Sequence, residues 1–87
     1  MNSVQSKLTE FVEEYLVKIA RAQKIGVDTP LLMNSDFDSL FVIELTLFVE
    51  REFNINFRQR PIERKNLETL STLMDFIDNA GAPLNHA

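Results

Sequence analysis

The chain has 87 residues, enough for one domain, and its 45% hydrophobic and 25% charged residues are typical of a folded globular protein. It has no cysteine, which excludes disulfides, thiolate metal sites and a cysteine nucleophile. Its apolar runs are far shorter than the roughly 18 residues of a membrane span, and the first residues lack the features of a signal peptide. We therefore expect a cytoplasmic protein with no membrane span. We also expect a monomer.

The net charge is −4, and phosphate contacts need clustered lysine and arginine, so we expect no nucleic-acid partner. The charge is uneven, however. Residues 58–65, named here the basic segment, carry four cations against Glu63 for a charge of +3, and the rest of the chain carries −7. The four cations are Arg58, Arg60, Arg64 and Lys65. A local patch of this kind can select partners without making the whole protein basic.

The first predicted element is a helix with Ser3 as a candidate N-cap. Its apolar residues follow the three-four spacing of one helical face. They are Val4, Leu8, Phe11, Val12, Tyr15, Leu16 and Ile19. We expect Tyr15 to be a core residue, and we expect the helix to stop near Gly26, which supplies a C-terminal signal.

Residues 27–37 are expected to form a loop that Pro30 interrupts and that Leu31 and Leu32 pin to the core. A second helix is predicted to start at Asp36 or Asp38. Its apolar pattern continues to about Phe53.

Residues 54–60 are predicted to connect the second helix to a short third helix, with Pro61 at its first position. A last helix, capped by Thr69, presents one apolar face and ends before Gly81. The predicted class is therefore all-α, with three longer helices, one short one and no convincing strand. We expect a single domain, 1–87, with an ordered part of about 3–80 and a C-terminal tail, 81–87.

The predicted helix from Leu40 to Phe53 carries two apolar stripes. The expected core stripe consists of Val42, Leu45, Thr46, Val49 and Phe53. The second stripe consists of Leu40, Phe41, Leu47 and Phe48, beside Glu44 and Arg51. Either the loop 27–37 covers this second stripe, or these six residues form a surface on which partner proteins dock.

Ser39 lies at the start of the same helix, directly after Asp38. Free backbone N–H groups and the positive end of the helix dipole favour an anion there, so a phosphodiester on Ser39 would be well placed. The alternative is that Asp38 or Ser39 is only a helix cap, which is a common role for both residue types.

Five sequence segments extend this pattern along nearly the whole chain, from the first helix to about Ile77. They read DTPLL at 28–32, FDSL at 37–40, EL at 44–45, EREFNI at 50–55 and NLETL at 66–70. In this combination and spacing the chain closely resembles the acyl carrier protein family. An Asp-Ser-Leu triplet alone would be a weak signal, whereas the full set is specific.

The resemblance implies a four-helix bundle in which Ser39 receives 4′-phosphopantetheine from coenzyme A. The thiol of that arm would carry an acyl or aminoacyl group as a thioester. The resemblance also assigns to Asp38 a role in metal and cofactor binding during transfer. The implied partners are a phosphopantetheinyl transferase, an acyl- or aminoacyl-activating enzyme, and condensing or acyl-transfer enzymes. A borrowed thiol also suits a chain that has no thiol and no visible catalytic dyad.

Two departures from the family pattern favour a specialised stand-alone carrier over a housekeeping fatty-acid carrier. The serine helix has Phe41, Phe48 and Arg51 where fatty-acid carriers place acidic residues, and the following region is basic. The usual glycine shortly before Asp38 is also absent.

Other functions are less well supported by the residues. Asn34, Asp36 and Asp38 alternate like the start of a calcium loop, but Ser39 and Leu45 occupy the positions that need glycine and glutamate. We therefore expect no metal site. His86, the single histidine, is expected in a frayed tail. An unmodified carrier-like domain that only docks partners stays an alternative, and a small enzyme is a more distant one.

Overall fold

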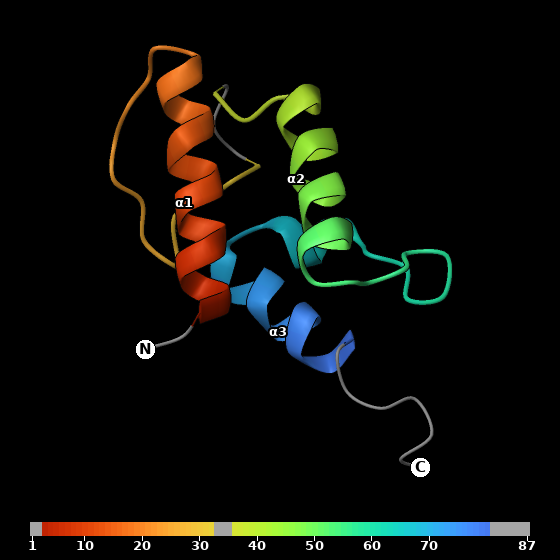
Figure 1. The fold of residues 1–87 in the computed structure, drawn as a ribbon. Helices are drawn as coiled ribbons and strands as arrows, with labels where there is room; N and C mark the ends of the chain where they lie inside the picture. The colour runs from red at the N-terminus through yellow and green to blue at the C-terminus, as the bar shows by residue number, and fades with distance from the viewer. Residues whose placement is uncertain (1–2, 33–35, 81–87) are drawn as a thin grey trace.

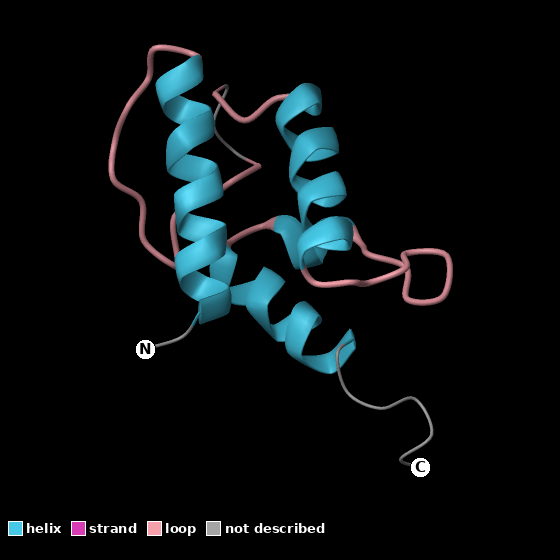
Figure 2. Cartoon of the chain, in the orientation of Figure 1, coloured by secondary structure: helices cyan, strands magenta, loops and turns pink. Residues whose placement is uncertain are grey.

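The computed structural model describes residues 3–32 and 36–80, and this part of the chain is all-helical (Figures 1 and 2). It contains α1 (Ser3–Lys18), α2 (Ser39–Glu52), the single 3-10 turn η1 (Arg64–Leu67) and α3 (Leu70–Ala80). No strand occurs among the described residues, which confirms the all-α class for them. A four-helix bundle is not confirmed, because the expected short third helix is only the turn η1.

The three α-helices pack around a common centre (Figure 1). Helices α1 and α2 lie side by side and run in opposite directions, and α3 crosses below them at a steep angle. Helix α3 contacts both α1 and η1. No helix in the described part of the chain has the length and apolarity that crossing a bilayer requires.

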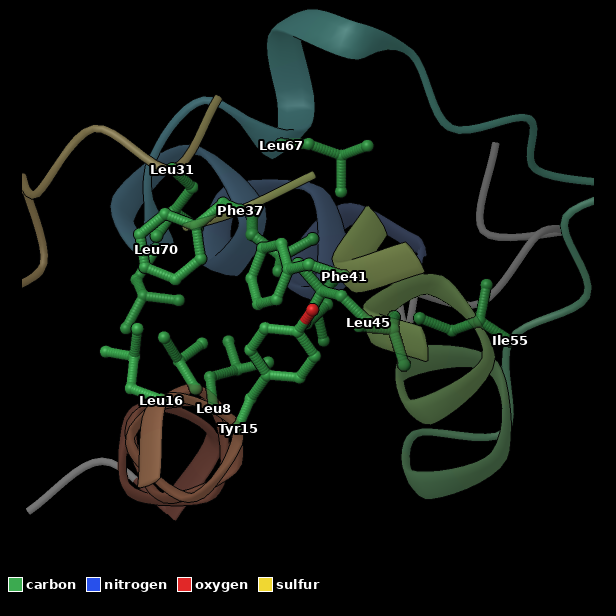
Figure 3. Packing of buried hydrophobic residues seen from close by; sticks show 14 residues of the cluster. Leu8, Tyr15, Leu16, Leu31, Phe37, Phe41, Leu45, Ile55, Leu67 and Leu70 are labelled. Atoms are coloured by element: carbon green, nitrogen blue, oxygen red, sulfur yellow. The ribbon is translucent and has the colours of Figure 1, made fainter. Parts of the chain in front are cut away.

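The core is one apolar cluster to which every helix contributes (Figure 3). Its buried members are Leu8, Val12, Tyr15, Leu16, Leu31, Phe37, Phe41, Leu45, Val49, Ile55, Leu67, Leu70, Leu73 and Ile77. Burying a side chain of leucine or phenylalanine size contributes about 1.5–3 kcal/mol each, so this cluster is the main source of stability. The prediction of Tyr15 as a core residue is confirmed.

Helix α1 ends eight residues before Gly26, so the prediction of its end is wrong. Ala20 adopts a left-handed conformation with φ 61° and closes the helix. Two hydrogen bonds complete this end: Ala20 N–H donates to the carbonyl of Val17 at 3.0 Å, and Arg21 N–H donates to the carbonyl of Leu16 at 2.8 Å. The left-handed residue is usually glycine, so an alanine here gave no signal in the sequence.

Helix α2 ends where the sequence predicts, with Phe53 as its C-cap. The following residue, Asn54, is left-handed with φ 56°, a conformation that asparagine tolerates. Ile55 N–H then donates to the carbonyl of Glu50 at 3.1 Å, and the Ile55 side chain is buried. Glu50 also anchors the next loop, because its carboxylate accepts a hydrogen bond from Phe57 N–H at 2.9 Å.

The loop between α1 and α2 is hydrogen-bonded to the start of α3, and Leu31 pins this loop to the core as predicted. Leu31 N–H donates to the carbonyl of Glu68 at 2.8 Å, and Ser71 N–H donates to the carbonyl of Val27 at 2.9 Å. The Leu31 side chain is fully buried, whereas Leu32 is only partly buried. These contacts hold the loop beside η1.

Thr69 caps α3 as predicted, since its Oγ1 accepts a hydrogen bond from Thr72 N–H at 3.1 Å. Pro61 does not open the short third helix. The turn η1 begins at Arg64, after Glu63 N–H donates to Asn66 Oδ1 at 2.8 Å and fixes the turn there.

Candidate functional site

Ser39 is the first residue of α2, and its side chain is exposed. The helix cap is the residue before it: Asp38 Oδ1 accepts a hydrogen bond from Phe41 N–H at 3.1 Å. The structure thus assigns the capping role to Asp38 and not to Ser39. Among the described residues the Ser39 hydroxyl has no hydrogen-bond partner, and it is accessible at the surface.

Tyr15 of α1 also forms a hydrogen bond to the Asp38 carboxylate. Its hydroxyl donates to Asp38 Oδ1 at 3.4 Å, and its ring lies edge-on against Phe41, with centroids 5.0 Å apart. In Figure 3 the Tyr15 oxygen points toward Phe41 on α2. One carboxylate oxygen therefore receives two donors, one from its own helix and one from α1.

Burial raises the pKa of the Tyr15 hydroxyl above its ordinary value of 10.0, and the charge of Asp38 raises it further. Tyr15 is therefore a neutral hydrogen-bond donor at physiological pH. The sequence predicted this tyrosine only as a core residue. Nothing local could have shown the link to Asp38, because the two residues are 23 positions apart.

A hollow of about 460 Å³ opens beside Ser39. Its lining is Leu32, Phe37, Asp38, Ser39, Val42, Ile43 and Arg64. The walls are mostly apolar, and Asp38 and Arg64 are the charged residues among them. The hollow therefore offers a short aliphatic group a place next to the serine, with one cation and one carboxylate within the same lining.

Three exposed apolar side chains lie along α2 and are named here the apolar stripe: Leu40, Ile43 and Leu47. Their exposed fractions are 55%, 55% and 52%. The spacing of three and then four residues places them on one helical face. The exposure of Leu40 and Leu47 agrees with their expected place on the outer side. Ile43 was missed, although the same spacing could have identified it.

The prediction that Phe41 belongs to the docking surface is wrong, because this side chain is fully buried. Its ring lies between Tyr15 and Phe37, and the centroid of Phe37 is 4.6 Å away. Phe48 is partly buried, and its ring stacks on Phe11 of α1 with centroids 4.4 Å apart. Both α1 and the loop before α2 pack on this side, so the buried face of α2 is wider than one stripe.

The two charged residues of the expected docking surface differ in their surroundings. Glu44 pairs with Lys18 at the end of α1, with a distance of 3.7 Å between nitrogen and oxygen. Arg51 is exposed and, with Leu47, lines a second hollow of about 550 Å³ at the end of α2. Leu47 and Arg51 thus form one accessible surface with both apolar and cationic character.

No cluster of three or more metal-ligating side chains occurs within residues 3–32 and 36–80. Asp36 pairs with Arg21 at 3.4 Å, and Asp38 caps α2. The predictions made for Asn34, His86 and the tail 81–87 lie outside the described residues.

A small helical domain with an exposed serine at a capped helix start fits the carrier proteins as a class. The comparison with known proteins makes this specific. The acyl carrier protein of Buchnera aphidicola subsp. Schizaphis graminum is 30% identical to this chain over 80 residues, which cover 91% of the chain and 95% of that protein. The chain therefore belongs to the acyl carrier protein family. No family model matches it, and no solved structure gives a significant match.

Proposed function

We propose that this chain is a carrier that holds an acyl or aminoacyl group on a 4′-phosphopantetheine arm attached to Ser39. The observation that carries the proposal is the division of roles at the start of α2. Asp38 supplies the cap, while the hydroxyl of Ser39 is exposed and has no structural partner among the described residues. Membership of the acyl carrier protein family gives this serine its expected chemistry.

The residues around Ser39 fit such an arm. A phosphodiester on the first residue of α2 would lie at the positive end of the helix dipole, near backbone N–H groups that lack partners within the helix. The hollow beside Ser39 offers apolar walls to the aliphatic part of the arm. When attached, the arm would supply the thiol that this chain lacks. Asp38, fixed through Oδ1, would keep its other carboxylate oxygen available to help bind the metal and cofactor during transfer.

The proposed partners are a phosphopantetheinyl transferase, an activating enzyme that loads the arm, and condensing or acyl-transfer enzymes that unload it. They would dock on the apolar stripe and on Arg51. We further propose that these enzymes belong to a specialised biosynthetic pathway. The support is the charge pattern, since Arg51 and the basic segment stand where fatty-acid carriers are acidic.

The direct test is the intact mass of the protein after incubation with coenzyme A and a broad-specificity phosphopantetheinyl transferase. We expect wild type and Ser6→Ala, a matched control on the exposed side of α1, to gain the mass of one arm. Ser39→Ala should gain nothing and should keep its helical circular dichroism spectrum, because Asp38 rather than Ser39 caps the helix.

Two outcomes would contradict the proposal. A mass increase that persists in Ser39→Ala would place the arm on another serine, such as Ser35 or Ser71. A wild type that gains no mass would instead support the alternative of an unmodified docking domain.

A further inference from the structure

Two hollows meet on the face of the molecule that carries Ser39. The hollow beside Ser39 adjoins another hollow of about 380 Å³, which is distinct from the one at the end of α2. This adjoining hollow is lined by Pro30, Leu32, Arg64, Glu68 and Thr69. Leu32 and Arg64 line both hollows and so lie at their junction. The hydrogen bond from Leu31 N–H to the carbonyl of Glu68 holds the loop and η1 together at this place.

Arg64 is the one cation in the lining of the hollow beside Ser39. Its side chain is exposed, and it forms no ion pair with any described residue. The neighbouring Lys65, in contrast, pairs with Glu63 at 3.4 Å. The bond between Glu63 and Asn66 fixes the turn that carries Arg64, so the position of the arginine beside the hollow is set by the backbone.

We propose that Arg64 is the counter-ion of the phosphodiester that joins the arm to Ser39. This inference rests on the proposed function. A phosphodiester carries one negative charge, and a guanidinium group offers several N–H donors that match two phosphate oxygens at once. The phosphodiester would begin at Ser39, which lines the same hollow as Arg64, so the two charges would border one hollow.

The apolar walls of the hollow add a second contact. The first carbon atoms of the arm beyond its phosphate carry two methyl groups, and Leu32, Val42 and Ile43 offer these methyl groups an apolar surface. Arg64 and these walls hold the proximal part of the unengaged arm against the body of the domain. The distal part, with its thiol, stays free to reach partner enzymes.

The experiment compares the unmodified and modified protein by nuclear magnetic resonance, after intact mass has shown that the arm is attached. The variants are Arg64→Gln and, as a matched control, Arg58→Gln, which removes an exposed arginine of the same basic segment. The signals are the Arg64 side-chain Nε–H and the backbone amides of Leu32 and Ile43. Amides next to Ser39 are left out, because attachment itself shifts them.

In wild type and in Arg58→Gln, attachment of the arm should shift all three signals. In Arg64→Gln the shifts of the Leu32 and Ile43 amides on attachment should fall to less than half of their size in wild type. In Arg64→Lys these shifts should be larger than in Arg64→Gln, because the positive charge is kept. In wild type, high salt should also reduce the shifts, since the pair is exposed to solvent.

Three results would overturn the inference: unchanged shifts in fully modified Arg64→Gln, an equal loss in both glutamine variants, or no shift at the Arg64 Nε–H in wild type. Each of these refutes only the role of Arg64. A wild type that gains no mass refutes the proposed function itself, and the two failures are therefore distinguishable. Spectra of the unmodified variants that match wild type away from the substitution show that each variant is folded.

Discussion

Two leucines on α2 allow the packing of this helix to be tested with one type of substitution. Leu45 is 1% exposed and lies in the core, whereas Leu47, two residues further along, is 52% exposed in the apolar stripe. Changing either leucine to alanine removes the same side-chain atoms. Both positions lie in the same helix, away from its ends. The change in helix propensity is small and similar at the two positions. A difference in stability between the two variants therefore measures burial.

Leu45→Ala should lower the free energy of unfolding by about 2–5 kcal/mol, which includes the cost of the cavity. At roughly 0.05–0.15 kcal/mol per residue, the whole domain is stable by only about 4–13 kcal/mol, so this is a large fraction. Leu47→Ala should stay within about 0.5 kcal/mol of wild type. With a shift of about 4–8 °C per kcal/mol for a domain of this size, thermal melts will separate the two variants clearly.

Urea unfolding followed by circular dichroism gives the free energies, and the slope of each transition checks that it stays two-state. If Leu45→Ala does not fold, Val49→Ala offers a milder change at a position that is also fully buried. A loss in Leu47→Ala as large as that in Leu45→Ala would refute the assignment of the two faces of α2.

Two further predictions concern Tyr15 and the choice of partners. The pKa of Tyr15 is raised, which means that the native state holds the hydroxyl proton more tightly than the unfolded chain does. The protonated Tyr15 hydroxyl therefore contributes to the free energy of unfolding fully below pH 10, and this contribution is lost as the pH rises further. Urea midpoints from pH 7 to 11 should show a steeper decline above pH 10 for wild type than for Tyr15→Phe, and parallel declines would contradict the burial of this hydroxyl. The loaded carrier should also be a poor substrate for a general fatty-acid condensing enzyme, because the cations of such an enzyme would meet Arg51 and the basic segment. A condensation rate equal to that of an acidic fatty-acid carrier would count against a specialised pathway.

Local chemistry explains which parts of the fold could be predicted. The start of α2 at Asp38, its end at Phe53 and the start of α3 at Thr69 all depend on groups within a few residues of the helix ends. The end of α1 could not be predicted in this way, because Ala20 adopts the left-handed conformation that Gly26 was expected to supply. Pro61 misled the prediction of the third element, since hydrogen bonding between Glu63 and Asn66 sets its position instead.

The faces of α2 depend on tertiary structure, which a helical wheel does not contain. The wheel separates apolar residues into stripes but cannot tell how many neighbours a helix has. Phe41 and Phe48 are covered because the loop residue Phe37 and the α1 residue Phe11 reach the side that the wheel left open. Of the two alternatives for the second stripe, coverage by the loop 27–37 thus holds for Phe41, whereas Phe48 is covered by α1 instead. Leu40 and Leu47 stay exposed and available to a partner.

The start of α2 combines a structural residue with a residue that the fold does not use. Asp38 Oδ1 accepts hydrogen bonds from Phe41 N–H and from the Tyr15 hydroxyl, so replacing Asp38 would disturb both the helix cap and the contact between α1 and α2. A loss of activity in an Asp38 variant would therefore have two explanations. Ser39 makes no such contact among the described residues. Because Ser39 contributes neither a cap nor a hydrogen bond to the described part of the fold, the proposed attachment of an arm can be tested at this residue without disturbing the fold.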